Sequence, residues 1–269
     1  MNDATKTPSN NAQQGSKGKL YLVPAPLDFG CDDATPLEQV MPQGTMEVAA
    51  KLGFWVSENA RSTRAYLKRV NELHPLNQPI QALQIQELPR EVHKKGDHGG
   101  HFDARPLLQA ALQGHDMGLV SEAGMPAIAD PGSSVVRAAH DLGLQVVPLA
   151  GPMSLVMALA ASGLNGQNFA FVGYLPQDAG ERSQRIRELE SLAHKTGQTQ
   201  IFIETPYRNT VLLSALLQTL NGNTRLALSC GLTLDTAWTR SAQVSVWKSK
   251  RDEKPGAPLA LPTVFCIGR

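Results

Sequence analysis

Residues 118–132, GLVSEAGMPAIADPG, decide the predicted fold because they join the end of a buried strand to an unusually restricted loop. The apolar run 117–121 has the length of a strand, and an amphipathic helical pattern follows over 133–143. A strand, a loop and a helix in this order are typical of a parallel α/β sheet. The loop holds two glycines and two prolines, more than a plain turn needs, which suggests a surface that faces a ligand.

The same alternation of strands and helices extends outward in both directions along the chain. Strands are predicted at 19–23, 54–59, 80–88, 117–121, 144–149, 168–176 and 199–205, and helices at 61–73, 103–114, 133–143, 154–162, 180–196 and 207–220. The remaining segments TRLALSCGL, TAWTRSAQVSVW and LPTVFCIGR are strand-like. We therefore predict two α/β domains: a mostly parallel sheet in residues 19–160 and a mixed sheet in 161–269.

Composition narrows the class of protein. The chain has 269 residues, 42% of them hydrophobic, and a net charge of +1, so it does not coat nucleic acid by charge alone. Residues 1–18 are polar without an apolar signal segment and predict a disordered tail, and no apolar run is long enough for a membrane span. Cys31, Cys230 and Cys266 are odd in number and far apart, which favours a reducing, cytoplasmic compartment.

Three predicted strand ends carry the same kind of loop: PAP at 24–26, GMP at 124–126 and AGP at 150–152. Ligands of open parallel sheets bind beyond the carboxyl ends of the strands. Glycine lets a ligand approach the backbone, and proline holds the loop in shape. The chain has neither a P-loop nor a dinucleotide motif, so this wall suits a neutral nucleoside better than a triphosphate. The alternative is that these loops are ordinary sharp turns between strands and helices.

Several side chains near these loops are candidates for chemistry. Glu58 and Glu122 each lie at the end of a predicted strand, facing the ligand cleft that these loops would form, and either is a candidate general base. Glu204 has a similar place in the second domain. The alternative is that these carboxylates cap loops or pair with Arg61 or Arg208.

Three residues are candidates for binding the substrate. Arg61 and Arg208 have side chains that can hold an anionic group, and Tyr207 can stack on a base. The alternatives are salt bridges at helix starts for the arginines and core packing for the tyrosine.

The polar segment 89–102 is long for a loop and contains His93, His98 and His101. The spacing of these histidines matches no zinc pattern, so we expect no metal site. We predict instead that the segment is a lid over the substrate.

Four segments resemble a known family: KLYLVPAP (19–26), residues 119–164, FVGYLP (171–176) and FIETPYRN (202–209). They resemble the tetrapyrrole methylase superfamily and, within it, the branch of ribosomal RNA small subunit methyltransferase I. The resemblance runs in order from about Lys19 to Arg269. It implies an S-adenosylmethionine-dependent methyltransferase of two α/β domains, with the cofactor bound in the cleft between them. It further implies that the protein methylates a ribose 2′-hydroxyl of small-subunit ribosomal RNA and forms a homodimer.

The resemblance also implies which residues bind S-adenosylmethionine. They follow the first, fourth and fifth predicted strands of the first domain, the first strand of the second domain, and a segment near the C-terminus. By position they are Pro24, Ala123, Gly124, Met125, Ile128, Met153, Ser154, Tyr174, Leu175, Pro262 and Thr263.

The sequence departs from the family pattern at several places. PAPLDF (24–29) stands where the branch usually has P-T-P-I-G-N, so that Asp28 lies near the place of a glycine. Residues 58–61 read E-N-A-R instead of E-D-T-R, and CGLTLDT (230–236) replaces R-E-L-T-K. These departures leave two alternatives open: a methyltransferase for a small molecule such as a tetrapyrrole, or a non-catalytic protein that binds the cofactor.

Overall fold

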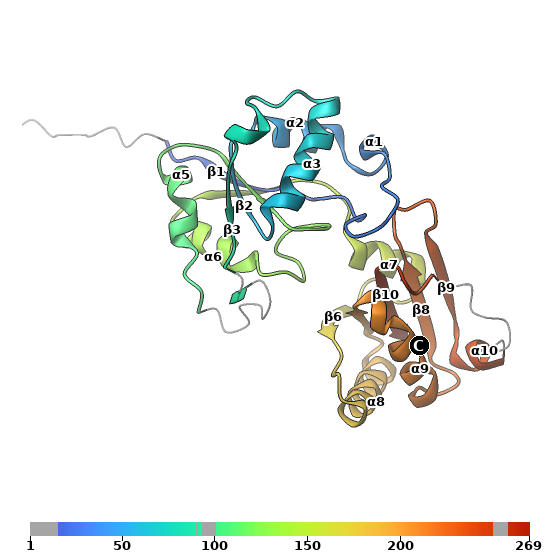
Figure 1. Ribbon diagram of the computed structural model, residues 1–269. Helices are drawn as coiled ribbons and strands as arrows, with labels where there is room; N and C mark the ends of the chain where they lie inside the picture. The colour runs from blue at the N-terminus through green and yellow to red at the C-terminus, as the bar shows by residue number, and fades with distance from the viewer. Residues whose placement is uncertain (1–15, 90, 93–100, 250–257) are drawn as a thin grey trace, which may run out of the picture.

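The computed structural model describes residues 16–89, 91–92, 101–249 and 258–269, which form two α/β units with a five-stranded sheet each (Figure 1). In Figure 1 the N-terminal unit lies above the C-terminal unit, and helix α7 lies where the two meet. One sheet is parallel and the other mixed, so the predicted fold class is confirmed. Residues 1–15 of the predicted tail, and His93 and His98 of the predicted lid, lie outside the described residues.

The N-terminal sheet has the strand order β3-β2-β4-β1-β5, and every adjacent pair of strands is parallel. All four residues of β4 are buried, which explains their uniformly apolar character. Because the strands share one direction, the loops beyond their carboxyl ends lie along the same edge of the sheet. The strands are β1 (Lys19–Leu22), β2 (Phe54–Ser57), β3 (Gln84–Glu87), β4 (Met117–Val120) and β5 (Gln145–Pro148).

Helices cover this sheet with two separate apolar layers. One layer packs Leu67 and Val70 of α3 with Met46 of α2, and the other packs Leu108 and Val135. The side chain of Asn59 caps α3 by accepting hydrogen bonds from two amides of its first turn. The helices are α1 (Leu37–Val40), α2 (Gln43–Lys51), α3 (Ala60–Leu73), α5 (Gln109–Leu112) and α6 (Ser133–Asp141), with 3-10 turns η1 (Ile80–Ala82) and η2 (Arg105–Leu108).

The C-terminal sheet has the order β6-β7-β10-β8-β9, with β6 parallel to β7 and the other neighbours antiparallel. Phe202, Leu212 and Phe265 belong to the core beneath its outer helices. The strands are β6 (Phe169–Tyr174), β7 (Thr199–Glu204), β8 (Arg225–Cys230), β9 (Trp238–Gln243) and β10 (Thr263–Gly268). The helices are α7 (Ser154–Ser162), α8 (Ala179–Thr196), α9 (Asn209–Thr219) and α10 (Val244–Ser249), with a 3-10 turn η3 (Pro206–Arg208).

Helix α7 packs on the C-terminal sheet although it follows the last strand of the N-terminal one. Its Leu155 and Leu159 belong to one apolar cluster with Ile201 and Val264. We therefore propose a domain boundary just before α7, a few residues ahead of the division at 160 that the sequence suggests.

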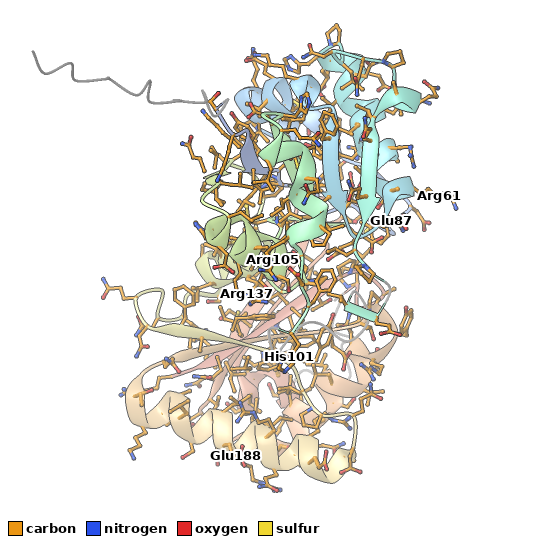
Figure 2. All side chains as sticks on the ribbon, turned by 90° about the vertical axis from the view of Figure 1, so that its left-hand side faces the viewer. Arg61, Glu87, His101, Arg105, Arg137 and Glu188 are labelled. Carbon is orange, nitrogen blue, oxygen red and sulfur yellow. The ribbon has the colours of Figure 1, made fainter. Side chains whose placement is uncertain are left out.

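Helix α8 carries a charged, solvent-facing side. Arg185 pairs with Glu188 at 3.2 Å, and Gln184 donates to the same side chain at 3.1 Å. Figure 2 shows Glu188 at the far end of the C-terminal unit, away from the N-terminal sheet. No described helix is both long and apolar enough to cross a membrane.

Three predicted elements differ in detail from the structure. Residues 80–88 form a 3-10 turn and then a short strand, and the helix predicted over 103–114 is reduced to η2 and α5. The strand predicted through Trp247 ends at Gln243, and α10 begins at Val244. Val244 and Trp247 are both buried, and their three-residue spacing places them on one face of a helix. Burial of this pair therefore overrides the local strand preference.

Candidate active site

The three loops rich in glycine and proline meet at the carboxyl edge of the N-terminal sheet. Ala25 and Gly124 each donate an amide hydrogen to the other's carbonyl, with both N···O distances 3.0 Å. Pro24 packs directly on Gly151, where an added Cβ would lie 2.4 Å from the Pro24 Cβ. Gly124 has φ +73°, a left-handed conformation that glycine adopts without strain. The loops after β1, β4 and β5 therefore form one rigid junction.

A cleft of about 1110 Å³ lies between this junction and the C-terminal sheet. Small-molecule sites typically enclose roughly 300–1,000 Å³, so the cleft has room for a cofactor and part of a second substrate. On the N-terminal side it is lined by Glu58, by residues 121–125 and 127–131, by Ser133 and by Met153. Ser154 and Leu155, at the start of α7, line it where the two units meet. On the C-terminal side it is lined by residues 171–175, Gln177, Ile203, Thr205 and Arg208.

Eight of the eleven residues predicted to bind the cofactor line this cleft. They are Ala123, Gly124, Met125, Ile128, Met153, Ser154, Tyr174 and Leu175.

The other three predicted cofactor residues do not line the cleft. Pro24 is buried behind the wall against Gly151, and Pro262 is exposed, with its carbonyl accepting from the amide of Gly231 at 2.9 Å. Thr263 is buried inside the C-terminal unit, where its hydroxyl accepts from the Asn209 amide group at 3.1 Å. The structure therefore gives these three residues packing and hydrogen-bonding positions outside the cleft.

Asp130 holds the loop after β4 in an unusual shape. Ala127 and Ala129 have φ of +68° and +63°, conformations that cost a residue other than glycine roughly 1–3 kcal/mol each. The Asp130 Oδ1 atom accepts hydrogen bonds from the amides of Ala127 at 2.9 Å and Gly132 at 2.7 Å. A Cβ at Gly132 would lie 2.8 Å from this oxygen, so the close approach requires glycine. The Asp130 carboxylate thus fixes the wall of the cleft.

Three carboxyl groups gather on the N-terminal wall: Glu58 after β2, and Glu122 and Asp130 after β4. The Glu58 Oε2 atom accepts from the amide of Glu122 at 3.4 Å, and Asn59 Nδ2 donates to Glu122 Oε1 at 3.1 Å. Burial raises the pKa of Glu58 to about 7, and the charges of Asp130 and Glu122 act in the same direction. Burial also raises the pKa of Asp130 to about 6, against the effect of its amide hydrogen bonds. A carboxyl group with a pKa near neutral pH is suited to accept a proton from a substrate.

The residues predicted to meet the substrate separate in the structure. Arg208 lines the cleft, and its Nη2 and Nε atoms donate to Glu204 Oε1 at 2.7 and 3.1 Å. Glu204 thus pairs with Arg208, which is the alternative that the sequence left open. Tyr207 is 87% exposed and lies outside the lining. Arg61 is also outside it, and Figure 2 shows it at the outer edge of the N-terminal unit.

The two segments that depart most from the family pattern are linked across the two units. Asp28 pairs with Arg69 at 2.9 Å, and Arg69 also donates to the carbonyl of Thr35 at 2.6 Å. The Thr35 hydroxyl then donates to the carbonyl of Thr233, in the loop after β8, at 2.6 Å. Asp28 is therefore part of a partly buried anchor that joins the loop after β1 to the C-terminal unit.

Sequence reasoning missed several lining residues, chiefly Gly173 and Asp130. Gly173 has φ +74°, lies in a register shift between Phe171 and Tyr174, and has open space where a Cβ would stand. A glycine inside a strand-like run is a signal for such a bulge. Asp130 gave no comparable signal, because its role depends on two neighbouring alanines with positive φ.

The predicted lid contributes little to the described part of the site. His101 is exposed and is not among the residues that line the cleft. Among the described residues, no three histidine, cysteine, aspartate or glutamate side chains are grouped so that they could hold a metal ion.

No family model matches this chain. It is 40% identical over 215 residues to ribosomal RNA small subunit methyltransferase I of Mesorhizobium japonicum, covering 80% of this chain and 63% of that protein. It is 30% identical over 228 residues to the protein of the same name from Halalkalibacterium halodurans, covering 85% of this chain and 69% of that protein. The chain therefore spans about two thirds of the length of these relatives.

Two solved structures share the fold. The methyltransferase CobJ is 15% identical with a TM-score of 0.54, and uroporphyrin-III-C-methyltransferase from Thermus thermophilus is 17% identical with a TM-score of 0.51. Each comparison covers 94% of both chains. At this identity the comparison shows a shared fold only, and it confirms the two α/β units that the resemblance implies.

Proposed function

This chain belongs to the ribosomal RNA small subunit methyltransferase I family, and we propose that it transfers a methyl group from S-adenosylmethionine to ribosomal RNA. The acceptor in this proposal is a ribose 2′-hydroxyl of the small subunit. The observation that carries the proposal is the cleft, which combines a wall of main-chain groups with a carboxyl group whose pKa is near 7.

The residues of the cleft fit an S-adenosyl group. Gly124 and Gly173 allow a ligand to approach the backbone from the two walls, and Met153 and Leu175 offer apolar contacts to an adenine ring. The Asp130 Oδ2 atom is buried and has no hydrogen-bond partner among the described residues, so it can accept from a ligand donor. S-adenosylmethionine supplies an electrophilic methyl group on a positively charged sulfur when it is bound.

The side chains of this chain take the remaining roles in the proposed transfer. Glu58 accepts the hydroxyl proton, since its raised pKa makes it an effective base near neutral pH. Asn59 donates a hydrogen bond to Glu122 and so orients that carboxylate on the wall that also holds Glu58. On the opposite wall, the guanidinium of Arg208 is placed to bind an anionic part of the substrate. Alignment of the hydroxyl with the methyl group supplies a large part of the rate enhancement in such a displacement.

Self-association and cytoplasmic location complete the proposal. Helix α7 buries Leu155 and Leu159 on the C-terminal sheet and exposes Val156 and Met157 on its outer side. Exposed apolar residues grouped on one helix suit an interface between two copies of the chain. Val156→Glu should therefore shift the mass in multi-angle light scattering from dimer to monomer. The cytoplasmic location follows from the ribosomal RNA substrate.

The direct test is calorimetry with S-adenosylmethionine and S-adenosylhomocysteine, followed by mapping of ribosomal RNA methylation in cells with and without the gene. We expect saturable binding, and the loss of one ribose methyl group when the gene is deleted. Ala123→Trp should fill the cleft and abolish binding, whereas Ala82→Trp, on an exposed turn outside the cleft lining, should not.

The outcomes separate the proposed function from its alternatives. Cofactor binding with an unchanged methylation map would leave a small-molecule substrate such as a tetrapyrrole, or a non-catalytic binding protein. Absence of cofactor binding would contradict the methyltransferase itself.

A further inference from the structure

The C-terminal rim of the cleft consists of residues 175–178 after β6 and 205–208 after β7. The two strands are parallel neighbours, so these segments leave the sheet side by side at one edge. Leu175, Gln177, Thr205 and Arg208 of the rim line the cleft. The proposed function assigns only Arg208 to the substrate and leaves the outer surface of the rim without a role.

Tyr207 presents its ring to solvent on this rim. It lies in the 3-10 turn η3 between Thr205 and Arg208 and is 87% exposed. Residues three apart share a face of a 3-10 turn, so Thr205 and Arg208 face the cleft together and Tyr207 projects beside its mouth. Val211 of α9 follows four residues later, a spacing that places it on the same side of a helix, and it is 52% exposed. Tyr207 and Val211 therefore form an apolar platform next to the cleft.

The turn that carries Tyr207 is held firmly in place. Pro206 restricts the backbone at its start, and the amide of Arg208 donates to the carbonyl of Thr205 at 2.9 Å. Glu204 Oε1 accepts from the amide of Thr205 at 2.7 Å and from Arg208 Nη2 and Nε at 2.7 and 3.1 Å. An aromatic surface that is already fixed in this way loses little conformational freedom when a flat ligand binds to it.

Two guanidinium groups on the rim have hydrogen-bond donors to spare. Arg208 uses Nη2 and Nε for Glu204, and its Nη1 makes no hydrogen bond to any described residue. Arg182, near the start of α8, donates from Nη1 to the carbonyl of Gln177 at 2.9 Å. The Nε atom of Arg182 is buried and has no hydrogen-bond partner within the described part of the chain. A buried N–H of this kind calls for an acceptor from outside the protein, and guanidinium groups bind phosphate oxygens strongly.

We propose that the C-terminal rim binds a single RNA strand: Tyr207 stacks on an unpaired base beside the methylated nucleotide, and Arg208 and Arg182 bind phosphates of the same strand. This inference rests on the proposed function, because it places the acceptor ribose in the adjoining cleft. A base inside a duplex is stacked on both faces, so only an unpaired base can lie on the Tyr207 ring. Cationic groups beside an exposed aromatic ring are the means by which proteins bind single strands.

The size and the charge of the platform favour RNA over a second copy of the chain. A stable protein interface buries roughly 800 Å² on each partner, whereas Tyr207 and Val211 offer little more than the area of one or two bases. The platform also continues into the cleft through Arg208, whose positive charge complements a phosphate. RNA is therefore the occupant that fits the ring and the guanidinium groups together.

The experiment measures binding of small ribosomal subunits, purified from cells that lack the gene, together with methyl-transfer kinetics on the same subunits. Tyr207→Ala should weaken binding about 5- to 150-fold, which corresponds to the loss of one stacked base. It should raise KM for the subunits more than it lowers kcat, and leave the affinity for S-adenosylhomocysteine unchanged. Tyr207→Phe keeps the ring and should bind within about twofold of the wild type. The exposure of Tyr207 allows both variants to fold.

Salt dependence tests the phosphate contacts. Arg182→Gln should reduce the slope of log affinity against log salt concentration by about 0.7, the value for one contact to a single strand. Arg185→Gln is the matched control, because Arg185 lies on the same helix and pairs with Glu188, and it should keep the wild-type slope. An oligouridylate of about 12 nucleotides should compete with the subunits more strongly as a single strand than when paired with oligoadenylate.

The possible results separate this inference from the proposed function. Wild-type binding of the subunits by Tyr207→Ala overturns the stacking role, and if that variant also changes from dimer to monomer in light scattering, the ring belongs to an interface between copies. An unchanged salt slope in Arg182→Gln overturns its phosphate contact, and equal competition by the duplex overturns the preference for a single strand. None of these results touches the proposed function as long as the wild type transfers methyl groups to the subunits. A wild-type protein that binds no S-adenosylmethionine and transfers no methyl group overturns both.

Discussion

Replacing Gly151 with alanine tests whether the three loops act as one junction. No positive φ is recorded at Gly151, so the backbone accepts alanine and the effect comes from the new methyl group alone. That methyl group would lie 2.4 Å from the Pro24 Cβ and 2.6 Å from its Cγ, whereas carbon atoms normally approach to about 3.5–4.0 Å. Pro24 and Gly151 must therefore separate by more than about 1 Å.

Movement of Pro24 away from Gly151 is resisted because the next residue, Ala25, exchanges two backbone hydrogen bonds with Gly124. Overpacking of this kind typically costs about 1–3 kcal/mol. For a protein of this size each kcal/mol lowers Tm by about 2–4 °C, so Gly151→Ala should lower Tm by about 2–12 °C. A shift of about 1 Å in the cleft wall should also reduce methyl transfer on the order of 100-fold.

Differential scanning calorimetry and a methyl-transfer assay measure the two effects. Gly44→Ala is the matched control, because a Cβ at Gly44 meets nothing within 4 Å and the residue lies in α2. Alanine in a helix is favoured over glycine, so this control should be unchanged or stabilised by up to about 1 kcal/mol. A Gly151→Ala protein with wild-type Tm and wild-type activity would refute the idea of a single rigid junction.

Three other substitutions probe the sheet, the helix start and the buried charge. Gly118→Ala should destabilise the fold by about 1–3 kcal/mol in urea unfolding, since its Cβ would lie 2.4 Å from the Trp55 ring; an unchanged midpoint would contradict this packing. Asn59→Ala removes the cap of α3 and should cost about 1 kcal/mol, with a larger loss in kcat than in cofactor affinity because Glu122 is released. Glu58→Gln should match the wild type in free energy of unfolding below pH 4.5 and exceed it above pH 7, by at most about 3 kcal/mol. The reason is that the pKa of Glu58 is higher in the folded than in the unfolded protein, so the wild type loses stability as the pH rises from 4.5 to about 7. Equal pH–stability curves for the two proteins would contradict the burial of that carboxyl group.

The sequence predicted the features of the fold that depend on local pattern. The apolar run of β4 and the glycines and prolines after β1, β4 and β5 are local signals, and they located one wall of the cleft. It did not predict that Val244 and Trp247 belong to a helix, because their alternating neighbours also suit a strand. Packing of these two side chains against residues distant in the sequence decides between helix and strand, and a short stretch of sequence does not contain that information.

The site was predictable only in part for a related reason. Glu58 and Glu122 could be proposed because each directly follows a strand that reaches the cleft. Asp130 could not, because its role depends on Ala127 and Ala129 adopting a conformation that their residue type disfavours. Such strain is supported by surrounding hydrogen bonds, which become visible only in three dimensions.

The departures from the family pattern favour retained catalysis when each is placed in the fold. Residues 58–61 keep Glu58, the first member of the usual motif, and Glu58 and Asp130 bring carboxyl groups to one wall of the cleft. Asp28, near the place of a missing glycine, is buried against Arg69 behind the cleft wall and adds no charge to the described lining. The altered motifs are therefore better explained by a changed anchor between the two units than by loss of the reaction.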